Sequence, residues 1–438
     1  MELTHGQLYH AADDDDVERF RELIQMGADV DESYEDRMNI STKSILHVCC
    51  GKGRVEMVNL LLDAGAYIGI NDKWGQTPLM YCVTTQFLEV AKRLLDRDPS
   101  IVDDQDSFGK SALHMAADNG LVDCVKMLLC HGAFVDIQNI EGYTPLMICC
   151  YSKSDPDSLT SIIKILIEAG ANVNLKERRS KRTALQMAAV TLYVKAVEML
   201  LEAGADPNLL DGAGRSAITS AICSKVRPIY YRNINPDLMT IIVMLIQAGS
   251  NLDLGLCEVS NPLITAVSRQ AESLVALFLS HGVNVNITFA SKATAILLAT
   301  TKGDLPCIKQ LLYYNTRLDM KGNIYRKREQ MEYFFDSMEF AVDDGKFDLV
   351  RLYYDVGYNL SNLKYLFGKG NIPKALLDNP EMHEWLIQRS RNPRSLLDIS
   401  IKNVREFLGL MPCEKVKKLP IPTRLKDMLL LKHILDIF

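Results

Sequence analysis

Histidine, cysteine and aspartate are the residue types in this chain that could support nucleophilic chemistry or metal binding. A cysteine nucleophile requires an exposed thiolate beside a positive charge. Cys49 and Cys149 instead stand in apolar runs, so we expect both thiols to be buried. His47 and His114 each follow a serine by three residues, and we expect their rings to hydrogen-bond to nearby backbone. The acidic run 13–16 lacks the oxygen-ligand spacing of a calcium loop and is expected to form a turn between helices.

Enzyme and metal motifs are missing from the sequence. It contains no nucleophile elbow, phosphate-binding loop, HExxH zinc motif or dinucleotide fingerprint. None of the eleven cysteines has the CxxC spacing and histidine partner of a zinc site. We therefore expect a non-catalytic protein with no metal and no cofactor. Its cysteines are expected to be buried free thiols in a reducing compartment.

Charge and hydropathy limit the classes of partner. A net charge of −6 provides no global basic field for nucleic acid or an anionic membrane. The first residues are polar and soon acidic, unlike a signal peptide. No stretch approaches the ~20 apolar residues of a membrane-spanning helix. We expect an intracellular protein of the cytoplasm or nucleus that binds neither nucleic acid nor membrane.

A recurring helix-start pattern organises most of the chain. Its leucine occurs at Leu46, Leu79, Leu113 and Leu146, at spacings of 33, 34 and 33 residues. The Thr or Ser before it can cap a helix, and Pro suits the first helical turn. A glycine follows the leucine by 19 residues, as Gly65 follows Leu46. Because glycine readily adopts the left-handed conformation that ends helices, the pattern predicts a pair of helices in each unit.

The pattern resembles the ankyrin repeat, which has a TPLH-type helix start and a 33-residue period. The resemblance implies an all-α fold with short β-hairpins, in which each unit covers an apolar face of its neighbour. About ten units are expected over residues 1–360, and residues 361–391 are expected to form capping or linking helices. The first-helix anchors are Leu8, Leu46, Leu79, Leu113, Leu146, Leu185, Ile218, Leu263, Ile296 and Met338.

Insertions interrupt the regular spacing at five places, around residues 33–42, 152–158, 176–182, 225–237 and 320–332. Insertions in a solenoid are expected on loops, often on the binding side. Whether the array continues through the insertion at 225–237 is left open.

Two groups of side chains are candidates for binding a protein substrate. Trp74, Phe108 and Tyr143 are large residues at expected hairpin tips, and clustered exposed aromatics often mark partner sites. Alternatively, these rings fold back on the adjacent hairpin. The second group could bind an acidic or phosphorylated segment, or it could be a solvated loop. It comprises Arg178, Arg179, Lys181 and Arg182.

Residues 392–438 depart from the repeat pattern. A helix that Asn392 can cap is expected to run to Gly409. The segment Leu419-Pro420-Ile421-Pro422 must be extended, because a residue before proline avoids helical conformation. A last helix is then apolar nearly all round. This segment is too small and too apolar to be stable alone, so it must dock on the repeats or on another protein.

The tail resembles a SOCS box in both of its halves. The first half resembles an elongin-binding box, with matches at Ser395, Leu396, Val404, Arg405, Leu408 and Gly409. The second resembles a cullin box, with matches at Leu419, Pro420, Pro422, Leu425 and Leu429. Ser400 occupies the position where the family usually has cysteine.

The whole chain thus resembles the ankyrin-repeat and SOCS-box family. The resemblance implies a substrate receptor that joins elongin-B/C and cullin-5 with its RING-box protein, so that a bound target is ubiquitinated and degraded. It assigns elongin binding to Leu396, Ser400, Val404, Phe407 and Leu408. It assigns cullin binding to Leu419, Pro420, Ile421, Pro422 and Leu425. The alternative is a plain ankyrin scaffold whose C-terminal three-helix module only caps the solenoid.

Overall fold

The structure of this chain is a computed structural model. It describes residues 6–35, 42–224, 235–255, 260–288, 291–326, 330–367 and 371–391, and within 392–438 only Val416, Lys418, Thr423 and Lys426. The predicted tail helices and most of the insertion at 225–237 therefore lie outside the described residues. The chain divides into two units, Met1–Gly212 and Ala213–Phe438.

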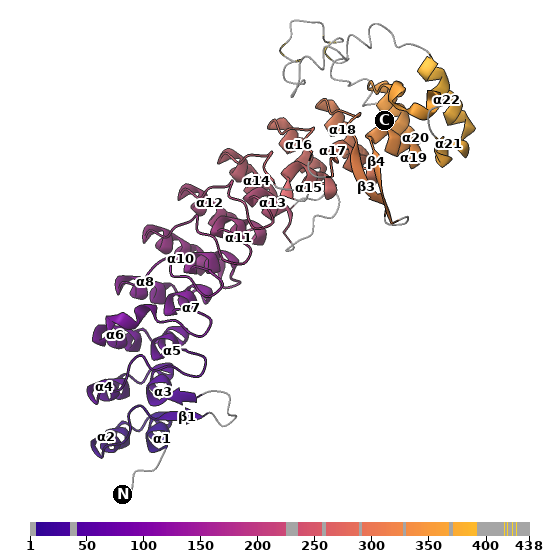
Figure 1. Ribbon diagram of the computed structural model, residues 1–438. Helices are drawn as coiled ribbons and strands as arrows, with labels where there is room; N and C mark the ends of the chain where they lie inside the picture. The colour runs from indigo at the N-terminus through magenta and orange to yellow at the C-terminus, as the bar shows by residue number, and fades with distance from the viewer. Residues whose placement is uncertain are drawn as a thin grey trace. The chain divides into compact units, whose positions relative to one another are not determined.

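The first unit is a stack of helix pairs in two layers (Figure 1). The first helices of the pairs pack on one another, and so do the second helices. The first layer contains α1 (Gln7–Asp14), α3 (Ile45–Lys52), α5 (Pro78–Thr85), α7 (Ala112–Asp118), α9 (Pro145–Tyr151) and α11 (Ala184–Thr191). The second contains α2 (Val17–Gln25), α4 (Val55–Asp63), α6 (Leu88–Arg97), α8 (Val122–Cys130), α10 (Pro156–Glu168) and α12 (Val194–Glu202).

Two short elements accompany these helices. Strands β1 (Ser33–Glu35) and β2 (Thr42–Ser44) pair antiparallel between α2 and α3. The short 3-10 helix η1 (Pro99–Asp103) follows α6. The strands lie at the predicted insertion of residues 33–42.

Local capping explains where the helices begin and end. Ser44, Thr77, Thr144 and Thr183 each accept a hydrogen bond from the backbone N–H three residues on, which satisfies a donor that the helix itself leaves unpaired. Most second helices of this unit end at a glycine with positive φ, such as Gly65 at +86°. A Cβ atom there would meet nothing within 4 Å, so the backbone conformation alone favours glycine.

Small side chains let the first helices approach closely. Ala116 and Ala188 are fully buried, as are Cys49 and Cys149 at the same position of their helices. The thiol of Cys149 donates to the carbonyl oxygen of Ala117 in the preceding first helix at 3.8 Å. Burial raises the pKa of Cys49 to about 12 and that of Cys149 well above 9.0. The prediction that both thiols are buried is confirmed, and this environment disfavours a nucleophilic thiolate.

The second unit begins with the same pairing of helices. Its first helices α13, α15, α17 and α19 pack in succession. They are α13 (Ala217–Ile222), α15 (Pro262–Ser268), α17 (Ala295–Lys302) and α19 (Ser337–Asp343), and their partners are α14 (Pro236–Gln247), α16 (Glu272–Ser280), α18 (Leu305–Tyr313) and α20 (Phe347–Asp355). The 3-10 helices η3 (Leu360–Asn362) and η4 (Lys364–Phe367) and the helices α21 (Lys374–Leu377) and α22 (Pro380–Arg391) follow.

A β-hairpin occupies the predicted insertion at 320–332. Strands β3 (Gly322–Arg326) and β4 (Met331–Phe335) pair antiparallel, with Ile324 opposite Tyr333. Ile324 is buried against Ala293, Leu297 and Phe340. This packing attaches the hairpin to the helices of its own unit.

The ten predicted anchors all lie in the first helix of a pair and are buried. Among the residues that the structure describes, no helix is both long and apolar enough to span a membrane.

Candidate partner-binding surface on the hairpin turns

The turns before the first helices are built around a buried acceptor. The Asp72 carboxylate accepts hydrogen bonds from the backbone N–H groups of Trp74 and Gln76, both at 2.8 Å. The Asp106 carboxylate does the same for Phe108 at 2.9 Å and Lys110 at 2.8 Å. An aspartate that bonds its own backbone in this way fixes a tight turn. The residue two positions after the aspartate is left at the tip.

Successive turns are joined by backbone hydrogen bonds. The donors and acceptors are Ser107 N–H to Trp74 O at 2.9 Å, Ile140 N–H to Phe108 O at 3.1 Å, and Arg178 N–H to Glu141 O at 2.8 Å. The tips of neighbouring repeats are therefore held side by side by the main chain.

Glycine is required in these turns for two reasons. Gly75, Gly109 and Gly142 have φ values of +74°, +71° and +84°, which side chains rarely tolerate. In addition, a Cβ atom on each would lie 2.7 Å from a backbone nitrogen of the next turn. A side chain there would push the next turn away and break the contact between tips.

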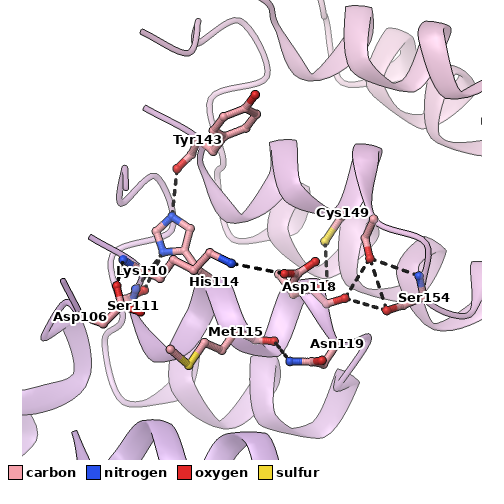
Figure 2. Close-up of polar contacts among 12 residues, drawn as sticks. Asp106, Lys110, Ser111, His114, Met115, Asp118, Asn119, Tyr143, Cys149 and Ser154 are labelled. Atoms are coloured by element: carbon pink, nitrogen blue, oxygen red, sulfur yellow. Dashed lines mark hydrogen bonds and ion pairs between the residues drawn. The ribbon is translucent and has the colours of Figure 1, made fainter. Parts of the chain in front are cut away.

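His114 ties one first helix to the next turn (Figure 2). Its Nδ1 accepts a hydrogen bond from the backbone N–H of Ser111 at 3.1 Å, so its Nε2 carries the proton and donates to the Tyr143 carbonyl at 2.9 Å. Burial lowers the pKa of His114 below 6.5, despite the opposing effect of this carbonyl. The neutral ring is thus the form that holds the turn.

Side chains at the same helix position connect other first helices to the next turn. The Nε2 of His47 contacts the Gln76 carbonyl at 2.8 Å, directly before the next helix cap, as His114 does. Gln186 donates at 2.8 Å to a different carbonyl, that of Leu209, two residues before Asp211. Burial likewise lowers the pKa of His47. The prediction that His47 and His114 bond to nearby backbone is confirmed.

Three apolar side chains near the tips of neighbouring turns are exposed to solvent. The exposed fractions are 47% for Trp74, 60% for Phe108 and 59% for Ile140. Tyr143 is half-buried. Trp74 and Phe108 each lie directly before the glycine of their turn, and the residue directly before Gly142 is Glu141. Tyr143 therefore does not occupy the tip position of its turn. In Figure 2 the Tyr143 ring points away from the His114 imidazole.

The basic turn of residues 177–182 has the same plan with a different anchor. The Glu177 side chain is fully buried and accepts backbone N–H bonds from Arg179 at 2.6 Å, Ser180 at 2.5 Å and Arg182 at 3.1 Å. Arg178, Arg179 and Lys181 are exposed. We call Trp74, Phe108, Ile140, Arg178, Arg179 and Lys181 together the tip surface.

Arg182 has a different environment from the other three cations. It is half-buried, and its Nε lies 3.7 Å from the buried Asp211 carboxylate on the next turn. The structure therefore separates the predicted basic group into one structural arginine and three outward cations.

Several exposed apolar residues were not singled out in the sequence. Ile140 lies one position before Glu141, so aligning the turns on their glycines pairs it with Lys73 and Ser107 and gave no signal for it. Tyr67 and Phe134 are 65% and 59% exposed, at positions where other units carry asparagine or aspartate. On the β3–β4 hairpin, Tyr325 and Phe334 are exposed as well. Tyr67 and Phe134 do not break the repeat period, so periodicity gave no signal for them. Tyr325 lies in the predicted insertion at 320–332 and Phe334 lies just after it.

The predicted tail residues lie outside the described residues. This applies to Leu396, Ser400, Val404, Phe407 and Leu408, and to Leu419, Pro420, Ile421, Pro422 and Leu425. Within the described parts of the chain, no group of three or more His, Cys, Asp or Glu residues could hold a metal ion. Residues 13–16 form the end of α1 and the turn into α2, where Asp16 caps α2.

Comparison with protein families identifies the repeats. A model described as ankyrin repeats (3 copies) matches residues 8–103, 46–139, 97–177 and 134–211. Residues 8–211 are therefore ankyrin repeats, and this part of the chain is a protein-interaction domain. Ankyrin repeats imply protein partners. The assignment of the later helix pairs as further repeats stays a prediction.

Comparison with individual proteins gives partial matches. Human ankyrin repeat and SOCS box protein 16 is 30% identical over 205 residues, which cover 46% of this chain and 44% of the relative. The putative palmitoyltransferase ZDHHC13 of Danio rerio is 28% identical over 208 residues, 47% of this chain and 30% of that one. The chain thus spans less than half the length of these relatives. The solved ankyrin domain of Bcl-3 has 24% identity and a TM-score of 0.45, covering 53% of this chain and 96% of that domain.

Proposed function

We propose that this chain is the substrate-recognition adaptor of an elongin-B/C–cullin-5 ubiquitin ligase. The observation that carries the proposal is the tail motif. An elongin-box pattern is followed ten residues later by Leu419-Pro420-Ile421-Pro422, behind ankyrin repeats. The match to a human ankyrin-repeat and SOCS-box protein supports the same assignment. In this role the chain is non-catalytic and promotes ubiquitination and degradation of a bound target.

The proposal divides the chain into three parts. Residues 1–360 form about ten ankyrin repeats that bind the target, and residues 361–391 cap or link them. Residues 392–438 form a three-helix SOCS box. The tip surface supports target binding, because its apolar and cationic side chains are exposed in a row that the main chain holds in place. We place the activity in the cytoplasm or nucleus, in line with nine described cysteines that are free thiols.

A second candidate is a plain ankyrin scaffold whose tail seals the stack. One observation favours it: Val416, one of the four described tail residues, is fully buried within the chain itself. Terminal caps are a general need of repeat proteins. A cap, however, has no need of the Leu-Pro-Ile-Pro segment, which is why we favour the ligase adaptor.

Co-expression with elongin-B/C separates the two candidates. The full chain should form a stable complex with elongin-B/C, and a chain ending at Arg391 should not. Leu396→Asp should abolish elongin binding, because it places a charge on the apolar helix face. Pro420→Ala with Pro422→Ala should retain elongin and weaken cullin-5. Thr423→Ala, at an exposed tail position, is the control and should change neither.

The outcomes are distinct. A full chain that stays free of elongin-B/C contradicts the adaptor role and leaves the scaffold. If the proline pair has no effect on cullin-5, the division of the tail into two contacts is wrong. Ser400→Cys should tighten elongin binding if the serine at that position weakens it, and an unchanged affinity shows that the hydroxyl is harmless.

A further inference from the structure

The turn at residues 177–182 differs from its neighbours in what it exposes. The preceding turns expose the apolar side chains of Trp74, Phe108 and Ile140, whereas this one exposes Arg178, Arg179 and Lys181. We propose that the tip surface binds an extended acidic segment of a protein. Apolar side chains of the segment contact the first three residues, and its carboxylate or phosphoryl groups pair with the three cations. This inference rests on the proposed target-binding role of the repeats.

The cations are held outward by a turn whose own polar groups are satisfied internally. Glu177 uses its carboxylate on three backbone N–H groups. Those N–H groups are therefore not available to a bound anion, which must be met by the side chains. Among the described residues, Arg179 and Lys181 have no side-chain ion pair, and Arg178 donates only to the Ile140 carbonyl at 3.3 Å. Charge complementarity thus selects an anionic partner.

Lys181 occupies a position where the three preceding turns use glycine. Its φ is +58°, against +74° at Gly75, +71° at Gly109 and +84° at Gly142. An L-residue is disfavoured in this region relative to glycine. The lysine at this position adds a third positive charge to the exposed surface of the turn.

The stacking sets the spacing of the expected segment. Packed helices lie roughly 8–10 Å apart, and an extended chain advances about 3.3 Å per residue. One repeat therefore corresponds to about three residues of an extended peptide. Apolar residues should recur about every third position along the segment, and acidic residues should follow within about three positions of the last of them.

Other anionic partners fit the surface less well. An exposed acid, Glu141, lies on the turn next to the cations, and the chain carries a net charge of −6. Nucleic-acid binding relies on many cations that contact phosphates along a strand. Three cations beside three apolar side chains match a protein segment that carries both kinds of group.

A random 12-residue peptide library selected on the full chain tests the proposal. Enriched peptides should contain acidic residues at one end and apolar residues about three positions apart. An enriched peptide should bind about tenfold or more weakly to the variant Arg178→Gln, Arg179→Gln, Lys181→Gly by fluorescence anisotropy. Lys181→Gly restores the residue of the other turns, so this variant should remain folded. The control Lys92→Gln, Lys126→Gln, Lys164→Gln removes three exposed charges from second helices and should bind normally.

Variants of the enriched peptide identify which chemical group supplies the negative charge that the cations bind. Versions of the peptide with glutamine, glutamate or phosphoserine at the acidic positions separate carboxylate from phosphoryl recognition. A single-stranded oligonucleotide that binds as tightly as the peptide overturns the proposal, and so does a library that enriches no acidic sequence. An unchanged affinity in the triple variant overturns it as well. The peptide-binding assay contains no elongin, so its outcome does not depend on elongin binding. If the full chain fails to bind elongin-B/C in the co-expression test, the ligase role is refuted and the peptide-binding result still stands.

Discussion

The turns around Asp72 and Asp106 and the turn around Glu177 share a backbone plan and present different surfaces. In each, a buried carboxylate accepts N–H bonds from its own turn, and a hydrogen bond joins the turn to a neighbouring one. The exposed side chains are aromatic in the first two and cationic in the third. The difference shows that the buried acceptor and the close approach of turns fix the structure. The side chains at the tips do not take part in these contacts, so they can differ between turns and determine which partner is bound.

The largest expected effect comes from removing the acceptor of the basic turn. Glu177→Ala leaves three backbone donors without their partner and should lower the free energy of unfolding by about 3–4 kcal/mol. Urea unfolding followed by circular dichroism measures this. Asp106→Asn is the control, because Asn139 accepts the N–H of Tyr143 at 2.9 Å in the equivalent place, and it should cost less than about 1 kcal/mol. Equal losses in the two variants would contradict the role given to Glu177.

A side chain at a turn glycine tests the close approach of neighbouring turns. Gly109→Ala adds a Cβ atom 2.7 Å from the Ile140 nitrogen at a φ of +71° and should cost about 2–3 kcal/mol. Gly132→Ala is the matched control, since its φ is +85° and its Cβ would meet nothing within 4 Å. It should cost only about 1–2 kcal/mol for the backbone conformation. If both variants lose the same stability, the contact between turns adds nothing.

The hydrogen bonds of His47 and His114 to the next turn make a contribution to stability that depends on pH. His114→Leu should lose about 1–2 kcal/mol at pH 7, because the Tyr143 carbonyl and the Ser111 N–H lose their partner. His114→Gln should lose less, since Gln186 in its own repeat accepts the N–H of the cap residue Thr183 and donates to a carbonyl of the next turn, that of Leu209. Urea unfolding at pH 7 compares the two variants. A glutamine variant as unstable as the leucine one would show that the hydrogen bonds are not what stabilises the turn.

The direction of the pH effect follows from the lowered pKa values. Burial places the pKa of His47 and His114 in the folded chain below 6.5, so the unfolded chain binds their protons more readily. Their contribution is complete above about pH 6.5 and declines as the pH falls toward the folded pKa. The double variant His47→Gln, His114→Gln should show a flatter loss of stability between pH 7 and 5. An unchanged pH profile would assign the acid sensitivity to other groups.

The smallest expected effect is an increase in stability. Lys181→Gly relieves a left-handed lysine and should raise the free energy of unfolding by about 1 kcal/mol. The same substitution should weaken binding of an acidic peptide, so stability and binding move in opposite directions. A variant that is less stable than the parent would mean that the Lys181 side chain supports the turn.

The repeat period predicted the helix pairs well because their signals are local. A capping Ser or Thr, an anchor such as Leu79 and a C-terminal glycine lie within one unit and need no neighbour to be recognised. The aromatic side chain of Tyr143 suggests a tip position, but the register of its turn, counted from Gly142, assigns that position to Glu141. The sequence does not reveal that Asp211 lies beside Arg182, which is why Arg182 differs from the other three cations.

The sequence by itself determined the helix pairs, their caps and the buried positions, since these depend on propensity and on periodic burial within each unit. It also carried the tail motif on which the proposed function rests. Only the tertiary structure decided which tip residues are exposed, which arginine is paired internally, and why glycine is required at Gly75, Gly109 and Gly142. Those properties depend on the next repeat in space, where a backbone nitrogen 2.7 Å from a would-be Cβ leaves no room for a side chain.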